Sequence, residues 1–258
     1  MRIAIGLEYD GTAYNGWQRQ RTGLGVQARV EEALETVADH PVEVVCAGRT
    51  DSGVHASGQV AHFETTSERE PRSWLLGANS NLPDDVNLTW ATVVSADFHA
   101  RYSAISRSYR YLILNRVQRS ALFRRRAWWV YAKLDADRMH RAAQALVGEH
   151  DFSAFRAAGC QAHTAMRNIT SISVDRDADW VTLEVTANAF LMHMVRNITG
   201  TLVAIGCGDE SETWAGEILE SRDRTCAGVA APPHGLTLTD VEYPAEFELP
   251  ANPNLDLR

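Results

Sequence analysis

The residues with the clearest potential for chemistry lie in one polar stretch, residues 47–56 (AGRTDSGVHA). Its two glycines, Gly48 and Gly53, permit positive φ angles on either side of Asp51, so the chain can bend sharply and hold the carboxylate out at the turn. Arg, Thr and His beside this carboxylate make Asp51 a candidate catalytic residue. The alternative is that Asp51 only caps its own turn.

A second candidate is Arg196, in a helix predicted over residues 190–205. Two apolar rows run along this helix, so we expect most of its surface to be buried. Arg196 falls in the second row. Because a buried guanidinium is costly without an anion beside it, it requires a carboxylate partner. Asp51 is one candidate partner, and a purely structural ion pair with another acidic residue is the alternative.

The third candidate is Tyr109, in a strand predicted over residues 107–114. It lies between Arg107 and Arg110. This arrangement suits a ring that stacks on a nucleic-acid base while the arginines hold phosphates. A tyrosine that simply packs in the core of a sheet is the alternative.

Charge is distributed unevenly along the chain. The net charge is −8, yet residues 98–134 contain no Asp or Glu and carry nine positive charges. Aromatic residues are interleaved with these cations. Cations for phosphates and flat rings for unstacked bases favour a nucleic-acid interface. The alternative is a solvated strand and loop in an arginine-biased sequence, since Lys133 is the only lysine.

Length and composition restrict the class of protein. A chain of 258 residues with 45% hydrophobic content can bury one large core or two closely packed halves. The sequence has no apolar window long enough to cross a bilayer and begins with a strand pattern rather than a leader, so we expect a soluble, cytoplasmic protein. The spacing of its four cysteines and nine histidines supports neither a metal site nor disulfides. No phosphate-binding or dinucleotide-binding motif is present, so no cofactor is expected.

The elements that would position Asp51 follow a recognisable order. Strands are predicted at residues 2–9, 42–46, 59–65 and 86–94. Helices are predicted at residues 26–38 and 71–77. The order β-α-β-β-α-β is that of a ferredoxin-like split unit, complete by about residue 95.

The same order recurs in the remainder of the chain. Asp135 is expected to cap a helix that runs to about residue 146. Residues 169–174 and 180–185 form a hairpin, helices follow at 190–205 and 212–219, and a strand at 236–241 closes the set. We therefore predict an α+β fold of two ferredoxin-like halves, residues 1–95 and 96–258, sharing one mixed, mainly antiparallel sheet with a central active-site cleft.

Several blocks of this sequence, taken together, resemble one family. The blocks are GWQRQ (16–20), GRTDSGVH (48–55), FHAR (98–101), RSYRY (107–111), FSAFR (152–156), HMVRN (193–197) and GLTL (235–238). In this order, and over nearly the whole chain, they are similar to those of the tRNA pseudouridine synthase A family. Ser52 stands where that family more usually has Ala.

The resemblance implies a reaction and roles for particular residues. The reaction is the isomerisation of uridine to pseudouridine at positions 38, 39 and 40 of the tRNA anticodon stem and loop, without metal or cofactor. Asp51 would be the nucleophile and Arg196 its ion-pair partner. Tyr109 would stack on the target base, with a possible role as proton relay, and Leu236 would pack beside the base. Further residues would contact the RNA: Arg19, Arg21, Arg49, His99, Arg101, Arg124, Arg125, Arg126 and Arg156.

The same resemblance implies tRNA as the partner and a homodimer as the assembly. Two other classes of protein stay open on the sequence alone. A non-catalytic ferredoxin-like RNA-binding protein would use the basic segment but would not need the Asp51 turn. An enzyme acting on a small molecule would use Asp51 but would leave the acid-free segment unexplained.

Overall fold

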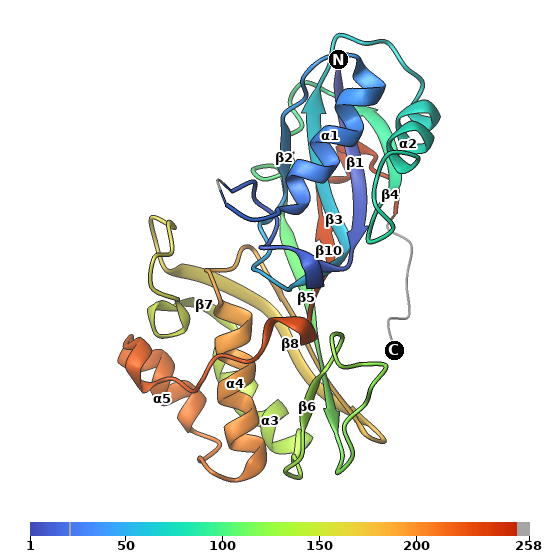
Figure 1. The fold of residues 1–258 in the computed structure, drawn as a ribbon. Helices are drawn as coiled ribbons and strands as arrows, with labels where there is room; N and C mark the ends of the chain where they lie inside the picture. Colours follow the sequence, from blue (N-terminus) through green and yellow to red (C-terminus); the bar gives the residue numbers. More distant parts are fainter. Residues whose placement is uncertain (21, 252–258) are drawn as a thin grey trace. The chain divides into compact units, whose positions relative to one another are not determined.

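The computed structural model describes residues 1–20 and 22–251. Within them the chain forms ten β-strands and five α-helices, an α+β fold whose strands belong to one mixed sheet (Figure 1). The predicted fold class is thus confirmed. The chain divides into two compact units, Met1–Arg107 together with the segment from Leu238 onward, and Ser108–Thr237.

The first unit has the predicted order β-α-β-β-α-β. Its elements are β1 (Arg2–Tyr9), α1 (Val26–Ala38), β2 (Val44–Cys46), β3 (His55–Glu64), α2 (Pro71–Asn79) and β4 (Val86–Val94). The strands follow the order β4, β1, β3, with β2 paired to β3. Helices α1 and α2 lie side by side along this sheet (Figure 1). The last strand of the chain, β10 (Leu236–Glu242), lies next to β3.

The core of this unit is built from alternating strand residues that face the helices. Ile3, Ile5 and Leu7 of β1 are fully buried, and the antiparallel register places Ile3 opposite Phe63 of β3. The ring of Phe63 lies 5.1 Å from that of Trp74 on α2, edge to face. Each of these side chains contributes about 1.5–3 kcal/mol by leaving water. Core packing therefore fixes the position of strand β3, which directly follows the Asp51 turn.

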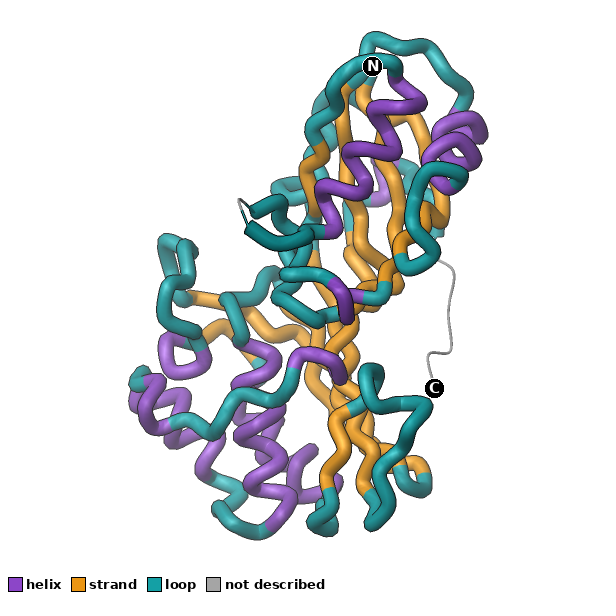
Figure 2. Tube along the Cα trace, in the orientation of Figure 1, coloured by secondary structure: helices purple, strands orange, loops and turns teal. Residues whose placement is uncertain are grey.

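The second unit is organised around a long antiparallel hairpin, as Figure 2 shows in its strand and helix colours. Its elements are β5 (Ser106–Asn115), β6 (Trp128–Val130), α3 (Ala136–Ala143), β7 (Gly148–Asp151), β8 (Met166–Asp177), β9 (Trp180–Ala187), α4 (Met194–Cys207) and α5 (Trp214–Ser221). The strand order is β5, β9, β8, β7, and β6 runs parallel to β5. Without β6, β7 and α5, the order from β5 to β10 is again β-α-β-β-α-β, which is consistent with a second ferredoxin-like half.

The first residues of helices α3 and α4 differ in how well the sequence predicts them. Asp135 caps α3 as predicted, because its Oδ1 accepts the N–H of Arg138 at 3.0 Å. The predicted start of α4 was wrong. The helix begins at Met194 rather than near residue 190, since His193 has a φ of 61°, a left-handed conformation that cannot continue a right-handed helix.

Parts of the sheet have no clear pattern in the sequence and were not predicted. Strand β3 begins at His55, ahead of the predicted residue 59, because pairing with β1 extends it through a stretch without β-branched residues. Strands β6 and β7 are short, and β7 (GEHD) lacks an apolar alternation. The first unit extends past residue 95, since the N–H of Ile105 donates to the carbonyl of Glu242 at 2.8 Å. Among the described residues, the helices are too short or too polar to span a membrane.

Candidate active site

The Asp51 turn connects β2 to β3, and its first residues are held by hydrogen bonds to β3. The N–H of Ala47 donates to the carbonyl of Val60 at 2.8 Å, and the amide of Gln59 donates to the carbonyl of Gly48 at 2.7 Å. Gly53 has a φ of 78°, as the sharp turn requires, whereas Gly48 does not adopt a positive φ. Of the two glycines that permit a positive φ in this turn, only Gly53 uses it.

A second loop, residues 14–17, is hydrogen-bonded to the turn. The carbonyl of Tyr14 accepts the N–H of Gly53 at 3.2 Å and the hydroxyl of Ser52 at 3.2 Å. The N–H of Trp17 donates to the carbonyl of Thr50 at 3.1 Å. A Cβ at Gly16 would lie 2.5 Å from that carbonyl oxygen, so only glycine allows this close approach. The two loops form one backbone framework.

Trp17 belongs to the core of this framework. Its side chain is 2% exposed, and its ring lies 5.9 Å from that of Tyr9. The Tyr9 hydroxyl is within hydrogen-bonding distance of the Thr50 hydroxyl, at 2.8 Å. Burial raises the pKa of Tyr9, so the phenol stays neutral and available for this hydrogen bond. Thr50, the residue directly before Asp51, is therefore held by a buried tyrosine.

Asp51 itself is half-buried, between the buried residues Thr50 and Val54. Its carbonyl accepts the N–H of Val54 at 3.1 Å, which closes the turn. The backbone of Asp51 is thus fixed, and its side chain is partly exposed to solvent. This is the arrangement that a carboxylate needs in order to reach a substrate from a fixed position.

His55 ties the far end of the turn to the end of β1. Its Nδ1 lies 3.1 Å from the backbone nitrogen of Gly11 and 3.1 Å from Oδ1 of Asp10. One ring nitrogen cannot accept from the first and donate to the second at the same time. We favour the hydrogen bond from Gly11, because a buried backbone N–H needs an acceptor. His55 then carries no proton on Nδ1.

Arg107 is a positioning residue that the sequence analysis assigned to phosphate contacts instead. Its side chain is buried in the first unit, and its guanidinium donates to the carbonyls of Ala47 (3.0 Å), Arg101 (2.6 Å) and Ala104 (3.2 Å). Ala47 is the first residue after β2. Arg107 therefore connects the start of the Asp51 turn to the loop at residues 101–104. The sequence pattern gave no sign that this arginine would be buried.

The loop that carries Arg19 depends on another buried charge. Glu31 of α1 is 1% exposed and accepts from the guanidinium of Arg19, the amide of Gln27 (2.9 Å) and the N–H of Val44 (3.0 Å). The Arg19 side chain remains 60% exposed, so it can still present surface to a ligand while it holds the loop. The contact could have been predicted from the sequence, because Glu31 lies on the apolar face of α1 and a buried carboxylate needs polar partners.

In the second unit, Tyr109 lies on a strand and Arg196 on a helix, as the sequence predicts. Tyr109 lies on β5, is 8% exposed and packs edge to face on Phe190 at 5.1 Å. Arg196 of α4 is half-buried, and its Nε donates to the carbonyl of Ala231 at 2.8 Å. Asp51 belongs to the first unit, so its pairing with Arg196 stays a prediction.

Leu236 lies at the start of β10 and is 5% exposed. The segment that leads to it is tied to the unit by the Tyr111 hydroxyl, which donates to the carbonyl of Pro232 at 2.7 Å. Burial raises the pKa of Tyr111, whereas the positive charge of Arg196 lowers it, so this phenol lies within the electrostatic reach of the guanidinium.

The other predicted RNA-contact residues divide into two groups. Five arginines are exposed: Arg49, Arg101, Arg124, Arg125 and Arg126. Two further residues, Arg156 and His99, are half-buried. Arg156 donates to the carbonyls of Cys160 (2.5 Å) and Ala162 (2.9 Å), and the Nδ1 of His99 accepts the N–H of Arg101 at 3.1 Å. Arg21 lies outside the described residues.

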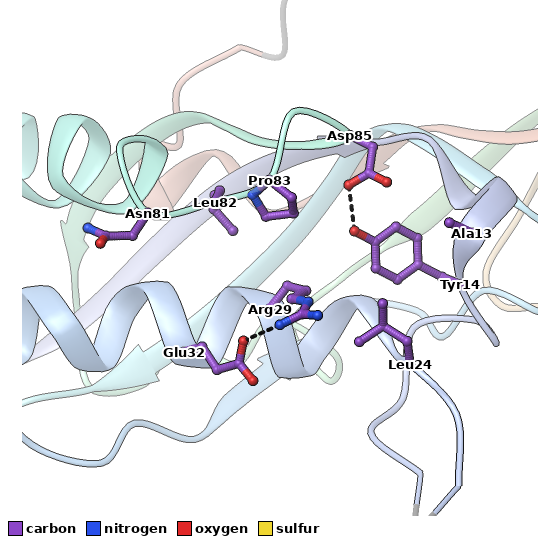
Figure 3. A pocket seen from close by; sticks show the side chains of 9 residues that line it. All are labelled: Ala13, Tyr14, Leu24, Arg29, Glu32, Asn81, Leu82, Pro83 and Asp85. Atoms are coloured by element: carbon purple, nitrogen blue, oxygen red, sulfur yellow. Dashed lines mark hydrogen bonds and ion pairs between the residues drawn. The ribbon is translucent and has the colours of Figure 1, made fainter.

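The first unit also carries an open hollow of about 380 Å³ (Figure 3). Its lining includes Tyr14, whose hydroxyl donates to Asp85 at 2.5 Å, and the ion pair of Arg29 with Glu32 at 2.7 Å. Asp51 is not among its lining residues. Tyr14 is the connection between the two, because its side chain lines the hollow while its carbonyl holds the Asp51 turn.

The described residues hold no cluster of three or more His, Cys, Asp or Glu side chains arranged for a metal ion. Cys46, Cys160, Cys207 and Cys226 are all free thiols. Burial raises the pKa of the Cys46 thiol to about 12, so this cysteine, just ahead of the turn, stays protonated and unreactive.

Comparison with known proteins gives one consistent answer. The family model described as tRNA pseudouridine synthase matches residues 6–103 and 142–244. Three curated relatives, each named tRNA pseudouridine synthase A, align over nearly the whole length of both chains. That of Coxiella burnetii is 54% identical, covering 98% of this chain and 97% of the relative. Those of Pseudoalteromonas atlantica (55%; 97% and 95% covered) and Cronobacter sakazakii (51%; 98% and 94% covered) are similar. The chain belongs to the tRNA pseudouridine synthase family.

Proposed function

We propose that this protein isomerises uridine to pseudouridine in tRNA, at positions 38, 39 and 40 of the anticodon stem and loop. The observation that carries the proposal is the Asp51 turn, a half-buried carboxylate on a backbone clamped from two sides. Membership of the tRNA pseudouridine synthase family, and relatives named tRNA pseudouridine synthase A over nearly their full length, support it.

The reaction rearranges one nucleotide without net gain or loss of atoms. The bond from N1 of uracil to C1′ of ribose breaks, the uracil turns, and a bond forms from C5 to C1′. N1 gains a proton and C5 releases one, so the reaction needs no oxidant, reductant or energy source. Because the target base is not accessible while stacked, it is flipped out at a cost of a few kcal/mol.

Asp51 is the nucleophile in this proposal. Arg196 serves as its ion-pair partner and keeps the carboxylate ionised, since an opposite charge nearby favours the charged form. Tyr109 stacks on the flipped uracil and, in this proposal, relays the proton that leaves C5, and Leu236 packs beside the base. The burial of Tyr109 and Leu236 fits side chains that line an apolar pocket for a base rather than an open surface.

Positive charge brings the tRNA to the protein in spite of the net charge of −8. The exposed arginines at 49, 101 and 124–126, together with Arg19, contact phosphates, and each contact releases counterions from the RNA. We further propose that two copies of the chain form a homodimer and that the protein acts in the cytoplasm, where tRNA is modified.

The test is release of tritium from tRNA labelled at C5 of uridine. The wild-type protein should release tritium to water, and Asp51→Asn should bind tRNA yet release none above background, since loss of a nucleophile costs on the order of 10⁶ in rate. Asp84→Asn, at an exposed turn of the same unit, is the control and should behave as wild type. If Asp51→Asn kept a tenth of wild-type activity, Asp51 would be only a turn residue. Binding without any release by the wild-type protein would favour a non-catalytic RNA-binding protein.

A further inference from the structure

A ladder of aromatic rings runs from the core of the first unit to its surface. It begins at Phe98, which is fully buried, and continues through His62 at 5.9 Å and His99 at a further 4.9 Å. It ends at Tyr102, whose ring lies 4.4 Å from that of His99 and is inclined to it by only 32°. Tyr102 is 76% exposed, so the ladder presents a supported aromatic ring to solvent.

The loop that carries this ring is held at each residue. The Nδ1 of His62 accepts the N–H of Ala100 at 3.1 Å, and the Tyr243 hydroxyl donates to the carbonyl of Ala100 at 2.6 Å. Arg107 fixes the carbonyl of Arg101, as described above. Because the backbone is constrained on both sides, Tyr102 is exposed without being loosely placed. A ring ordered in advance loses little conformational entropy when a ligand stacks on it.

The rings beneath Tyr102 are neutral. Burial, followed by the nearby His99 and Arg2, lowers the pKa of His62 to about 4. The Nδ1 of His99 accepts the backbone N–H groups of Arg101 (3.1 Å) and Tyr102 (3.2 Å), so it carries no proton there, and burial lowers the pKa of His99 as well. The ladder is therefore an uncharged surface at neutral pH, suited to stacking on a flat ring.

A positive charge lies at the exposed end of the ladder. The guanidinium of Arg101 lies 5.6 Å from the centre of the Tyr102 ring, near the outer limit of a cation–π contact, so it can turn to a neighbouring anion. Residues 98–134 contain no Asp or Glu. A nucleotide is a flat ring attached to an anion, and aromatic side chains beside arginine are how proteins hold unpaired bases.

The ladder also lies beside the Asp51 turn. One guanidinium nitrogen of Arg107 contacts both the carbonyl of Ala47 at 3.0 Å and the carbonyl of Arg101 at 2.6 Å. The loop that carries Tyr102 and the start of the turn that carries Asp51 are therefore direct neighbours. A nucleotide stacked on Tyr102 would be held close to the proposed nucleophile.

We propose that Tyr102 is a stacking platform for one unpaired base of the substrate RNA, with Arg101 on the phosphate beside it. This inference rests on the proposed function, because it assigns a second contact on the same RNA. The platform acts in binding and orientation. It holds a base other than the uridine that reacts with Asp51, since that uridine requires the enclosed pocket proposed at Tyr109 and Leu236.

The experiment uses an anticodon stem-loop RNA in which 2-aminopurine replaces the unpaired bases one at a time. With wild-type protein and Tyr102→Phe, the fluorescence of one substituted position should be quenched on binding. With Tyr102→Leu this quenching should disappear, and the RNA should bind roughly 5- to 150-fold more weakly, as expected for loss of one stacked base. Leu76→Ala, which removes an exposed apolar side chain on α2 of the same unit, is the control and should leave both signals unchanged.

The kinetics distinguish the platform from a structural role. Tyr102→Leu should raise KM for tRNA while kcat at saturating tRNA stays within about threefold of wild type, and its thermal unfolding should match that of the control. Equal quenching and equal affinity for Tyr102→Leu and Leu76→Ala would overturn the platform, even if the wild-type protein released tritium. Quenching that depends on Tyr102, in a wild-type protein that released no tritium, would uphold the platform and refute the proposed function.

Discussion

Arg107→Met should disrupt two loops with one substitution. The Arg107 guanidinium is buried and donates to three backbone carbonyls, those of Ala47, Arg101 and Ala104. A hydrogen bond from a charged donor contributes about 1.5–3 kcal/mol net. Removing a charge from water costs several kcal/mol and offsets part of this sum. We therefore expect Arg107→Met to lower the free energy of unfolding by about 3–5 kcal/mol.

For a chain of this size, such a change lowers the melting temperature by about 10 °C. Urea unfolding at 25 °C measures the free energy directly. Well below the melting temperature, tritium release should also fall by about tenfold in kcat, because the carbonyl of Ala47 loses its anchor at the start of the Asp51 turn. Arg107→Lys keeps the charge but cannot reach three carbonyls at once, so it should recover only part of the loss.

The matched control is Arg110→Met, on the same strand. The Arg110 side chain is 30% exposed and pairs with a Glu184 side chain that is 52% exposed, and a surface pair of this kind contributes at most about 1 kcal/mol. If Arg107→Met unfolded within 1 kcal/mol of wild type and kept its full kcat, the three carbonyl contacts would not position the turn. Equal destabilisation by both variants would show that the assay reports the loss of any arginine.

Three further predictions concern pH, salt and the proposed ion pair. The pKa of His62 is about 6.5 in the unfolded chain and about 4 in the folded chain, so lowering the pH from 7 to 5 protonates the unfolded chain first. The free energy of unfolding should therefore fall by about 2 kcal/mol between pH 7 and pH 5. Thermal melts should show this loss in wild type and not in His62→Gln. Replacing the three arginines at 124–126 by Gln should reduce the slope of log Kd against log salt for tRNA by two to three units, and an unchanged slope would remove them from the interface. Arg196→Met should lower both unfolding free energy and activity, and adding Asp51→Asn should restore some stability but no activity; no recovery in urea unfolding would mean that the two charges are not paired.

The sequence predicted the elements whose signals are local. The alternation of residues 2–9 and 86–94 and the helical period of 26–38 gave the bounds of β1, β4 and α1 as the structure has them. The Asp51 turn followed from its glycines and polar residues. These features depend on the backbone preferences of short stretches, which a single sequence expresses directly.

The supporting contacts were not predictable because they join residues far apart in the chain. Nothing near Arg107 indicates that its guanidinium is buried beneath the carbonyls of Ala47 and Arg101, and the acid-free composition around it suggested an exposed phosphate contact instead. Glu31 was better signalled, since a carboxylate on an apolar helix face must meet polar partners when buried. Strand β7 lacked any pattern and forms only because β8 offers it an edge to pair with.

Several of the contacts that fix the Asp51 turn are made to its main chain. Gly53 donates to the carbonyl of Tyr14, Trp17 to that of Thr50, and the amide of Gln59 to that of Gly48. These three hydrogen bonds involve main-chain groups that Asp51→Asn does not alter. Equal unfolding free energies of wild type and Asp51→Asn in urea would therefore assign a loss of activity to the missing carboxylate, and a large difference between them would assign it to a displaced loop.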